Sequence, residues 1–474
     1  MESNNRGQWK SNFGFLMAAI GSAVGLGNIW GFPFKMGSNG GFAFLLVYIV
    51  MAALVGFTIM LGEFGLGRTT GKSSIATYRM LSKRFKWLGW PGFISAFLIL
   101  SFYCVLGGYC VKYVVVNVCE LFGAVYGSGG EIFGELTGNM TESLIYTLIF
   151  VILNAVIVMG GISGGIEKFS KVAMPALFVM LVIIIIRSVT LDGAVEGIRF
   201  MFKPNFEPFR ENFLGVVAKA GGQMFFSLSI GVGTMLTYGS YLRKEENLER
   251  NCALIVIADT VVALMAGLAV IPASFAIGGA DAAMAGPGLL FITLQDVFRS
   301  MGALGPVFGI IFYLLVVIAA VTSSISIIEI ITTFYLDNAE AKGKTASRKK
   351  VTIITCVVVM ALASIVAIDG MGGNGIWIPF QNSLGVIGSF NDCWVDFMDF
   401  WAEGIFMPLT ALLMCIFIGY EYGVDRFGEE VALCGNRFVS RGFFRVCCKV
   451  IAPAAMVLIF LGQIDSIFAL HIFG

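Results

Sequence analysis

The sequence is poor in charged residues, which make up only 13% of its 474 residues, whereas 58% are hydrophobic. A soluble globular domain carries about a quarter charged residues, so this composition excludes that class. The remaining charges nearly cancel to a formal net charge of +1, and no basic patch of the kind that nucleic-acid binding needs is present. We therefore expect a polytopic membrane protein embedded in a lipid bilayer, without a nucleic-acid partner.

Histidine is almost absent, and the ten cysteines are scattered along the chain. The single histidine, His471, lies three residues from the end, so an intramembrane Ser-His protease or zinc site would lack its essential side chains. Neither a His-Glu-x-x-His motif nor a Cys-x-x-Cys spacing occurs. We expect most cysteines to be small core residues and the protein not to be an enzyme.

Long apolar runs are abundant, and a membrane-spanning helix needs roughly 20 such residues. The N-terminus is too polar for a cleaved signal peptide, so the first run is expected to remain as a span. The sequence predicts eleven spans, at about residues 13–35, 41–67, 89–124, 144–161, 169–188, 214–241, 251–278, 304–336, 351–368, 394–421 and 447–472.

Lysine and arginine gather in alternate loops between these spans. If the N-terminus is cytoplasmic, the loops on that side hold most of the basic residues, whereas the loops at 125–143 and 369–395 hold none. The loop at 187–213 is the exception, with four basic residues. The positive-inside rule thus predicts a multi-pass protein of the cell membrane with a cytoplasmic N-terminus. The odd number of spans places the C-terminus outside.

Glycine interrupts the first span, where an ordinary helix would continue. Gly21, Gly25 and Gly27 each weaken a helix by roughly 1 kcal/mol relative to alanine, and Pro33 removes a backbone donor. Broken backbone at membrane depth is tolerated only where it is buried or lines a watery cavity. Such a segment is therefore expected to hold a ligand with its freed backbone groups.

The sixth span repeats this pattern between Gly221 and Gly233. Glycine-interrupted segments at corresponding positions of two halves indicate a transporter binding site. Spans 1–5 (residues 1–188) and 6–10 (residues 214–421) are predicted to form two five-helix repeats of opposite topology, with residues 422–474 as a loop and span 11. The alternative is that these glycines only allow neighbouring helices to pack closely. This alternative could explain one interrupted span, but it is less able to explain two interruptions that lie five spans apart.

Four segments resemble the signature sequences of the neurotransmitter:sodium symporters: residues 21–33, 225–231, 322–324 and 399–401. The resemblance extends from Arg6 to about residue 420. It implies a LeuT-type all-α membrane fold, a 5+5 inverted repeat with discontinuous first and sixth helices. It also implies sodium-coupled uptake of amino acids or related amines by alternating access, in a monomer or homodimer.

The resemblance further implies where a substrate binds. The N–H groups of Leu26 and Gly27, at the start of the resumed first helix, and the Tyr103 hydroxyl would hold a carboxylate. Position alone would instead favour Tyr103 as a packed aromatic. The carbonyls of Ala23, Phe226 and Ser227 would accept from the ammonium. The side-chain pocket would be lined by Ser22, Ile99, Phe226, Ser229, Val232, Ser323 and Ile327.

None of these pocket residues carries a fixed charge, so a charged substrate side chain would meet a large desolvation cost. Val232 stands where LeuT has a phenylalanine, which leaves room for a large aliphatic or aromatic side chain. We therefore expect a sodium symporter for neutral amino acids. The alternatives are the same fold coupled to protons, or one that carries a different small amine or zwitterion.

The resemblance implies two sodium ions, which are hard cations that prefer oxygen ligands. The first would bind at Ala23, Asn28, Ser227 and the substrate carboxylate, with Asp259 close by. The second would bind at the carbonyls of Gly21, Val24 and Ala319 and the hydroxyls of Thr322 and Ser323. The alternative for these two hydroxyls is a bond to their own helix. Asp259, a costly charge at membrane depth, indicates function by itself, and in this family it implies independence from chloride.

Two gates are also expected from the resemblance. Inside, Arg6 would pair with Asp337 at the end of span 8, and Trp9 and Tyr241 would cover the pair. A lone buried charge is costly, so such a pair can act as a latch.

The outer gate departs from the family pattern. Asp399 matches its acidic member, but Gly31 stands where the partner arginine is expected. Lys35, about one turn further out, is one replacement. Closure by packing of Phe226 with Tyr103 is the other.

Overall fold

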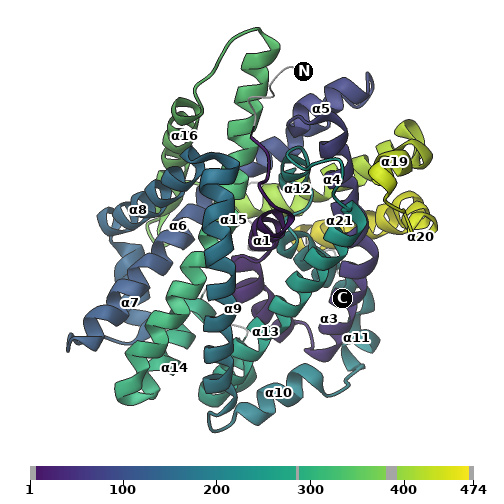
Figure 1. Ribbon diagram of the computed structural model, residues 1–474. Helices are drawn as coiled ribbons and strands as arrows, with labels where there is room; N and C mark the ends of the chain where they lie inside the picture. The colour runs from purple at the N-terminus through teal and green to yellow at the C-terminus, as the bar shows by residue number, and fades with distance from the viewer. Residues whose placement is uncertain (1–6, 284–287, 380–391, 469–474) are drawn as a thin grey trace.

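The computed structural model describes residues 7–283, 288–379 and 392–468. All regular elements within these ranges are helices, and most run roughly side by side (Figure 1). Nine helical segments in this part of the chain are long and apolar enough to span a membrane, and one bent pair of helices makes a tenth. The predicted all-α membrane architecture is confirmed.

Most of the predicted spans are continuous helical segments. Spans 2 to 5 are α3 (Phe42–Met51) with α4 (Phe57–Thr70), α6 (Gly89–Leu121), α8 (Met140–Met159) and α9 (Glu167–Val189). Spans 7 to 11 are α13 (Leu248–Ala283), α15 (Gly305–Ala341), α16 (Arg348–Asp369), α17 (Trp394–Asp399) with α18 (Met407–Ile416), and α20 (Arg441–Val446) with α21 (Ala452–Phe468). Short π-helical turns join the paired pieces.

The first span is broken where glycine predicted it. Helix α1 (Asn12–Ala23) ends at Val24, whose backbone is extended at φ −75° and ψ 96°. A π-helical turn at Gly27–Gly31 then leads into α2 (Phe32–Ser38). The two halves are bent by 48°, so the predicted discontinuity of the first helix is confirmed.

The sixth span is broken in the same manner. Helix α11 (Glu207–Ser227) stops, residues 228–233 form turns, and α12 (Thr234–Gly239) resumes. Gly231 and Gly233 adopt φ values of 85° and 92°, which glycine permits, and Ser229 is held at φ 50°. Strained non-glycine residues of this kind gather at binding sites. The α11–α12 pair is not among the ten apolar segments counted above, but it takes the place of the predicted sixth span, so the eleven predicted spans are roughly matched.

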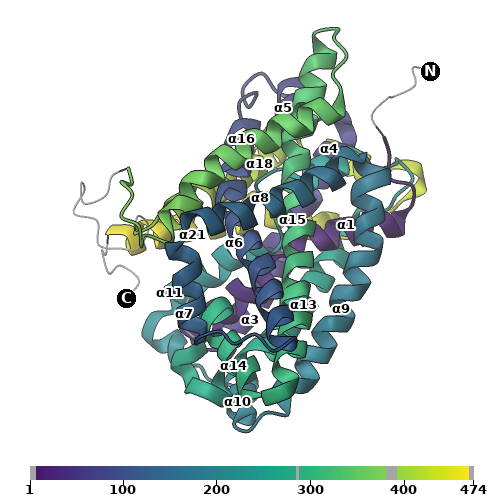
Figure 2. The same ribbon diagram turned by 90° about the vertical axis from the view of Figure 1, so that its left-hand side faces the viewer.

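The broken first helix lies at the centre of the bundle. Helix α1 contacts α9, α13 and α15, and α15 packs along α6 (Figure 1). The short helices α10 (Ala194–Phe202) and α14 (Leu294–Ser300) cover one end of the bundle, and α5 (Ser74–Leu81) covers the other (Figure 2). We call the end with α5 the basic end, because the lysine- and arginine-rich stretches 68–86 and 342–350 lie there.

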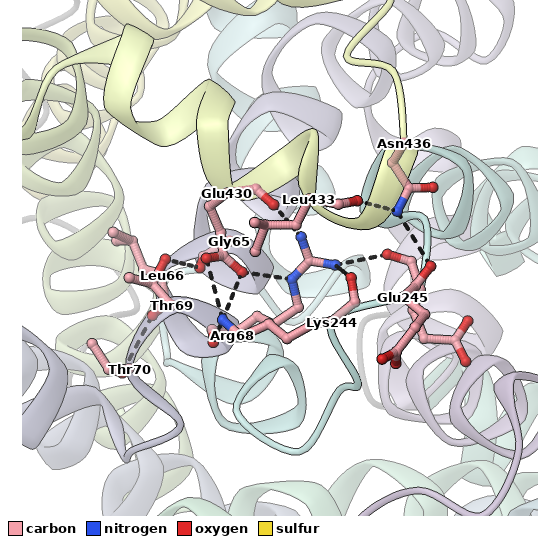
Figure 3. A network of polar contacts seen from close by, with 11 residues as sticks. Gly65, Leu66, Arg68, Thr69, Thr70, Lys244, Glu245, Glu430, Leu433 and Asn436 are labelled. Atoms are coloured by element: carbon pink, nitrogen blue, oxygen red, sulfur yellow. Dashed lines mark hydrogen bonds and ion pairs between the residues drawn. The ribbon is translucent and has the colours of Figure 1, made fainter.

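A buried ionic network ties three distant segments together at the basic end (Figure 3). The fully buried Arg68 side chain, on α4, donates from Nε to Glu430 Oε1 at 2.8 Å and from Nη1 to the Glu246 carbonyl at 2.7 Å. Lys244 Nζ donates to the same Glu430 carboxylate at 3.0 Å. The network links α4, the loop between α12 and α13, and α19 (Val424–Val431).

Candidate substrate and ion site

A cavity of about 360 Å³ lies where the two helix breaks meet. Nine of the twelve residues that the sequence predicted for substrate binding line it, and Gly25 and Met407 line it as well. The nine are Ala23, Gly27, Ile99, Tyr103, Phe226, Ser229, Val232, Ser323 and Ile327. The fold therefore brings together side chains that are separated by up to some 300 positions in the sequence.

One end of the cavity is polar. The Leu26 N–H, at the start of the resumed first helix, donates to the Tyr103 hydroxyl at 3.0 Å. A Cβ atom on Gly25 would lie 2.5 Å from Ser323 Oγ and 2.6 Å from the Tyr103 hydroxyl oxygen. Glycine is thus needed at position 25 to leave room for both hydroxyls. An N–H group and two hydroxyls converge at this end, as an anionic ligand group requires.

The other end of the cavity is apolar and contains one residue that the sequence did not predict. Met407, the first residue of α18, is buried beside Val232. A Cβ atom on Gly231 would lie 2.5 Å from the Met407 carbonyl oxygen, so the tenth span touches the break of the sixth. No local motif surrounds Met407, and only the fold places it in the cavity.

The three remaining predicted residues do not line the cavity with their side chains. The Ser22 hydroxyl lies 2.7 Å from the Ser326 hydroxyl, and the Ser22 carbonyl accepts from Ser229 Oγ at 2.8 Å. Leu26 contributes its backbone N–H. The Ser227 hydroxyl donates to Asp259, away from the cavity lining.

Asp259 is the centre of a fully buried polar cluster beside the cavity. Asn28 Nδ2 donates to Asp259 Oδ1 at 2.8 Å and to Ser227 Oγ at 2.9 Å. Ser227 Oγ and the Tyr48 hydroxyl donate to Asp259 Oδ2 at 2.8 Å and 3.1 Å. The predicted residues Asn28, Ser227 and Asp259 are therefore in direct contact. Tyr48 was not predicted, because it lies in an apolar run without any polar motif.

A second group of oxygens lies between the first break and α15. Thr322 Oγ1 donates back to its own helix, at the carbonyls of Ile318 (3.1 Å) and Ala319 (3.0 Å). Ser323 Oγ instead crosses to α1, where it donates to the Ser22 carbonyl at 3.1 Å and, at 3.4 Å, to that of Gly21. Val24 caps the end of α1. Four of the five predicted residues, Gly21, Ala319, Thr322 and Ser323, thus lie together. The Thr322 hydroxyl bonds within its own helix, whereas the Ser323 hydroxyl bonds to α1.

The chemistry of both groups suits a hard monovalent cation. The first offers an amide, hydroxyls and the single carboxylate of Asp259, and the second offers carbonyls and hydroxyls. No cluster of three or more His, Cys, Asp or Glu residues that could hold a metal ion occurs in the part of the chain that the structure describes. Oxygen ligands with little formal charge match sodium better than zinc or iron.

Glu63 fixes the break in the sixth span. Its carboxylate accepts from the Gly231 N–H at 2.6 Å and from the Leu236 N–H at 3.1 Å. These groups flank the start of α12, where the positive end of the helix dipole favours an anion. The unwound backbone is thereby held in one conformation beside the cavity.

Three of the four residues predicted for the inner gate, Trp9, Tyr241 and Asp337, lie within the described residues. Arg6 lies outside the described residues. The buried Asp337 accepts a hydrogen bond from the Ser73 N–H at 2.6 Å. Trp9 Nε1 donates to the Tyr238 carbonyl at 3.1 Å, and the Tyr241 hydroxyl donates to Glu329 at 2.8 Å.

At the predicted outer gate, a glutamine lies beside Gly31. A Cβ atom on Gly31 would lie 3.2 Å from Gln223 Oε1, and Gln223 Nε2 donates to the Gly27 carbonyl at 2.8 Å. Lys35 Nζ lies 5.8 Å from the centre of the Phe226 ring.

Lys35 is also within electrostatic range of two neighbouring carboxylates, Asp399 and Glu403. The sequence predicted Lys35 and Asp399 here but not Glu403. Lys35, one turn from the position at which an arginine was expected, is thus a basic side chain in the neighbourhood of Asp399.

Comparisons with known proteins agree with this architecture. The model of the sodium:neurotransmitter symporter family matches residues 6–122 and 131–472. The uncharacterized sodium-dependent transporter YhdH of Bacillus subtilis is 35% identical over 466 residues, which cover 96% of this chain and 97% of the relative. An uncharacterized sodium-dependent transporter of Haemophilus influenzae is 34% identical over 479 residues, covering 98% of this chain and all of the relative.

A solved structure shares the fold over nearly the whole chain. The crystal structure of MhsT in complex with L-phenylalanine superposes with a TM-score of 0.85 at 35% identity, and covers 97% of this chain and 100% of MhsT. The predicted LeuT-type fold is thus confirmed. The chain belongs to the sodium:neurotransmitter symporter family and is a sodium-dependent, multi-pass membrane transporter.

Proposed function

We propose that this transporter imports neutral amino acids with a large aliphatic or aromatic side chain, together with sodium, by alternating access. The observation that carries the proposal is the cavity at the two helix breaks, which is polar at Tyr103 and apolar at Val232. The complex of MhsT with L-phenylalanine supports an aromatic substrate.

The polar end suits the charged groups of an α-amino acid. The substrate carboxylate would replace the contact between the Leu26 N–H and the Tyr103 hydroxyl, and would accept from both groups. It would lie at the positive end of the resumed helix dipole. The ammonium would donate to carbonyls of the two unwound segments, at Ala23, Phe226 and Ser227.

The apolar end selects against charged side chains. No Lys, Arg, Asp or Glu is among the described residues that line the cavity. A substrate side chain with a formal charge would have to be desolvated without a partner, which costs several kcal/mol. Leucine, methionine, phenylalanine or tryptophan would instead bury apolar surface against Ile99, Val232 and Met407.

Two sodium ions accompany the substrate in this proposal. The first would bind at Asn28, Ser227, Asp259 and the Ala23 carbonyl, next to the substrate carboxylate. The second would bind at Gly21, Val24, Ala319, Thr322 and Ser323. Because Asp259 already supplies a negative charge at the first site, we infer that transport does not require chloride.

Alternating access would use the two inverted repeats, residues 1–188 and 214–421, with the basic end facing the cytoplasm. The N-terminus would then be cytoplasmic and the C-terminus outside. The inner gate would consist of Arg6 and Asp337, covered by Trp9 and Tyr241. At the outer gate, position 31 holds glycine in place of the expected arginine. Lys35 would take over the role of that arginine and would attract Asp399 and Glu403.

Uptake into proteoliposomes tests the proposal. Labelled phenylalanine should accumulate with external sodium and not when potassium replaces it, and unlabelled leucine should compete whereas glutamate should not. Equal uptake in potassium would refute the sodium coupling, and effective competition by glutamate would refute the neutral specificity. A thermal-shift screen of amino acids with and without sodium identifies the preferred substrate, because a ligand stabilises only the form that it binds.

A further inference from the structure

A second hollow, of about 760 Å³, opens at the basic end between α5 and the last turns of α15. None of its lining residues lines the substrate cavity. The residues that line this hollow include Lys72, Ser73, Arg79, Met80, Phe334 and Glu340. The hollow is therefore separate from the substrate cavity, and of the residues assigned above to transport it shares Asp337 of the proposed inner gate.

Ser73 offers an unused hydrogen-bonding group in this hollow. The residue is fully buried, yet its hydroxyl has no hydrogen-bond partner among the described residues. Its backbone N–H is already engaged, because it donates to the Asp337 carboxylate at 2.6 Å. Buried polar groups in native proteins are nearly always paired. Other buried hydroxyls in the described residues also have no partner, but this one lines the hollow and is therefore available to a ligand there.

The charges inside the hollow leave one cation available. Lys72 pairs with Glu340 at 2.9 Å, and Asp337 accepts from Ser73. Arg79 forms no ion pair within the described ranges, and its guanidinium lies over the Trp90 ring at 5.9 Å from the centre. The carboxylates therefore have donors, and Arg79 faces outward with its hydrogen-bonding capacity unused.

The segment that follows α5 is strongly basic and aromatic. Lys83, Arg84 and Lys86 directly follow α5, are exposed, and form no ion pair in the part of the chain that the structure describes. Met80 is 63% exposed, and the exposed Trp87 and Trp90 lie beside these cations. Tryptophan prefers the headgroup level of a bilayer. This segment thus has the composition of a surface in contact with anionic headgroups.

We propose that this hollow binds the phosphate group of an anionic phospholipid. The Ser73 hydroxyl and the Arg79 guanidinium donate to phosphate oxygens, while Lys83, Arg84 and Lys86 neutralise the remaining headgroup charge. The acyl chains lie against Met80 and the tryptophans. A bound lipid would hold α5 against α15, where Ser73 already contacts Asp337.

Thermal unfolding of the purified transporter in a neutral detergent tests this assignment. Short-chain phosphatidylglycerol should raise the melting temperature, whereas short-chain phosphatidylcholine and inorganic phosphate should not. Native mass spectrometry should show one retained phosphatidylglycerol. Ser73→Ala should weaken this binding by several-fold, and the triple variant K83Q/R84Q/K86Q should weaken it by about five-fold per charge removed.

A matched triple variant at the same end separates a defined site from the general surface potential. K349Q/K350Q/R437Q removes the same charge from exposed positions outside the hollow and should retain both the shift and the bound lipid. Equal shifts from the two lipids, or equal losses in the two triple variants, would overturn the proposal. A shift with inorganic phosphate alone would assign the hollow to a soluble anion and would also overturn it. Sodium-driven uptake is measured separately, so the two proposals fail independently.

Discussion

The hydroxyl of Ser227 donates to the carboxylate of Asp259 at 2.8 Å, and this contact ties the broken end of α11 to α13. Asn28, from the first break, donates to the other oxygen of the same carboxylate at 2.8 Å. One buried anion therefore connects both discontinuous helices. A cation that binds there would act on the two unwound segments at once, as coupling between ion and substrate requires.

Replacement of Asp259 by asparagine should make transport sensitive to chloride. The change removes the negative charge but keeps the size of the side chain, and hydrogen bonds to a charged group are worth about 1.5–3 kcal/mol each. The apparent sodium affinity should fall by about tenfold or more. Uptake is compared in chloride and in gluconate, at a series of sodium concentrations.

Tyr48→Phe is the matched control for Asp259→Asn. It removes one hydrogen bond to the same carboxylate but leaves the charge in place, so sodium affinity should fall by less and chloride should have no effect. If Asp259→Asn transports equally well in both anions, the carboxylate does not take the place of chloride.

Replacement of Glu63 by glutamine should destabilise the unwound part of the sixth span. The N–H groups of Gly231 and Leu236 bond to different oxygens of the carboxylate. Glutamine places an NH2 donor where one of these oxygens lies, so one of the two N–H groups would face another donor. A buried donor without a partner costs about 1–3 kcal/mol. The melting temperature and substrate binding should both fall, whereas the exposed Glu135→Gln should change neither. Normal binding with Glu63→Gln would mean that this carboxylate does not support the site.

The Arg68 network predicts that the loss of a buried ion pair lowers the free energy of unfolding much more than the loss of an exposed one. Arg68→Ala leaves Glu430 with Lys244 as its remaining cation and should cost about 1.5–3 kcal/mol for each charged hydrogen bond that is lost, since the Arg68 side chain is fully buried. Arg441→Ala breaks an exposed pair with Asp425, which is worth about 1 kcal/mol or less. Thermal unfolding of the two variants measures the contrast. Similar melting temperatures would show that the network in Figure 3 carries little stability.

Much of the site was predictable because its signals are local in the sequence. Helix breaks come from glycine clusters, which act on the backbone at their own positions, so Gly21–Gly27 and the stretch before Gly233 predicted both discontinuities. The fold and family followed from the same segments. Asp259 could be recognised because a carboxylate within an apolar run is conspicuous.

Residues without a local signal were missed. Tyr48 and Met407 lie in ordinary apolar runs, and each reaches the site only through the packing of distant helices. The sequence also did not predict the hydrogen-bond partner of each hydroxyl. The Thr322 hydroxyl donates to a carbonyl of its own helix, whereas the hydroxyl of its neighbour Ser323 donates to a carbonyl of α1. Such choices depend on which carbonyls the neighbouring helix presents, and the sequence of one span does not contain that information.

The size of the apolar end should determine which amino acids are carried. Val232→Phe fills the space beside Met407 and should reduce the affinity for phenylalanine by about tenfold or more, because overpacking a tight site costs about 1–3 kcal/mol. Alanine, which does not reach this end, should be affected little.

Met407→Ala should enlarge the same end of the cavity. Phenylalanine would lose apolar contact and bind more weakly, while tryptophan should lose less because it can fill part of the space. Met407→Leu, which conserves volume, serves as the control and should leave the preference close to that of the unmodified protein. Competition of unlabelled alanine, phenylalanine and tryptophan with labelled leucine measures the order of substrate preference. An unchanged order in both Val232→Phe and Met407→Ala would show that the substrate side chain lies elsewhere, and the assignment of the apolar end would then be wrong.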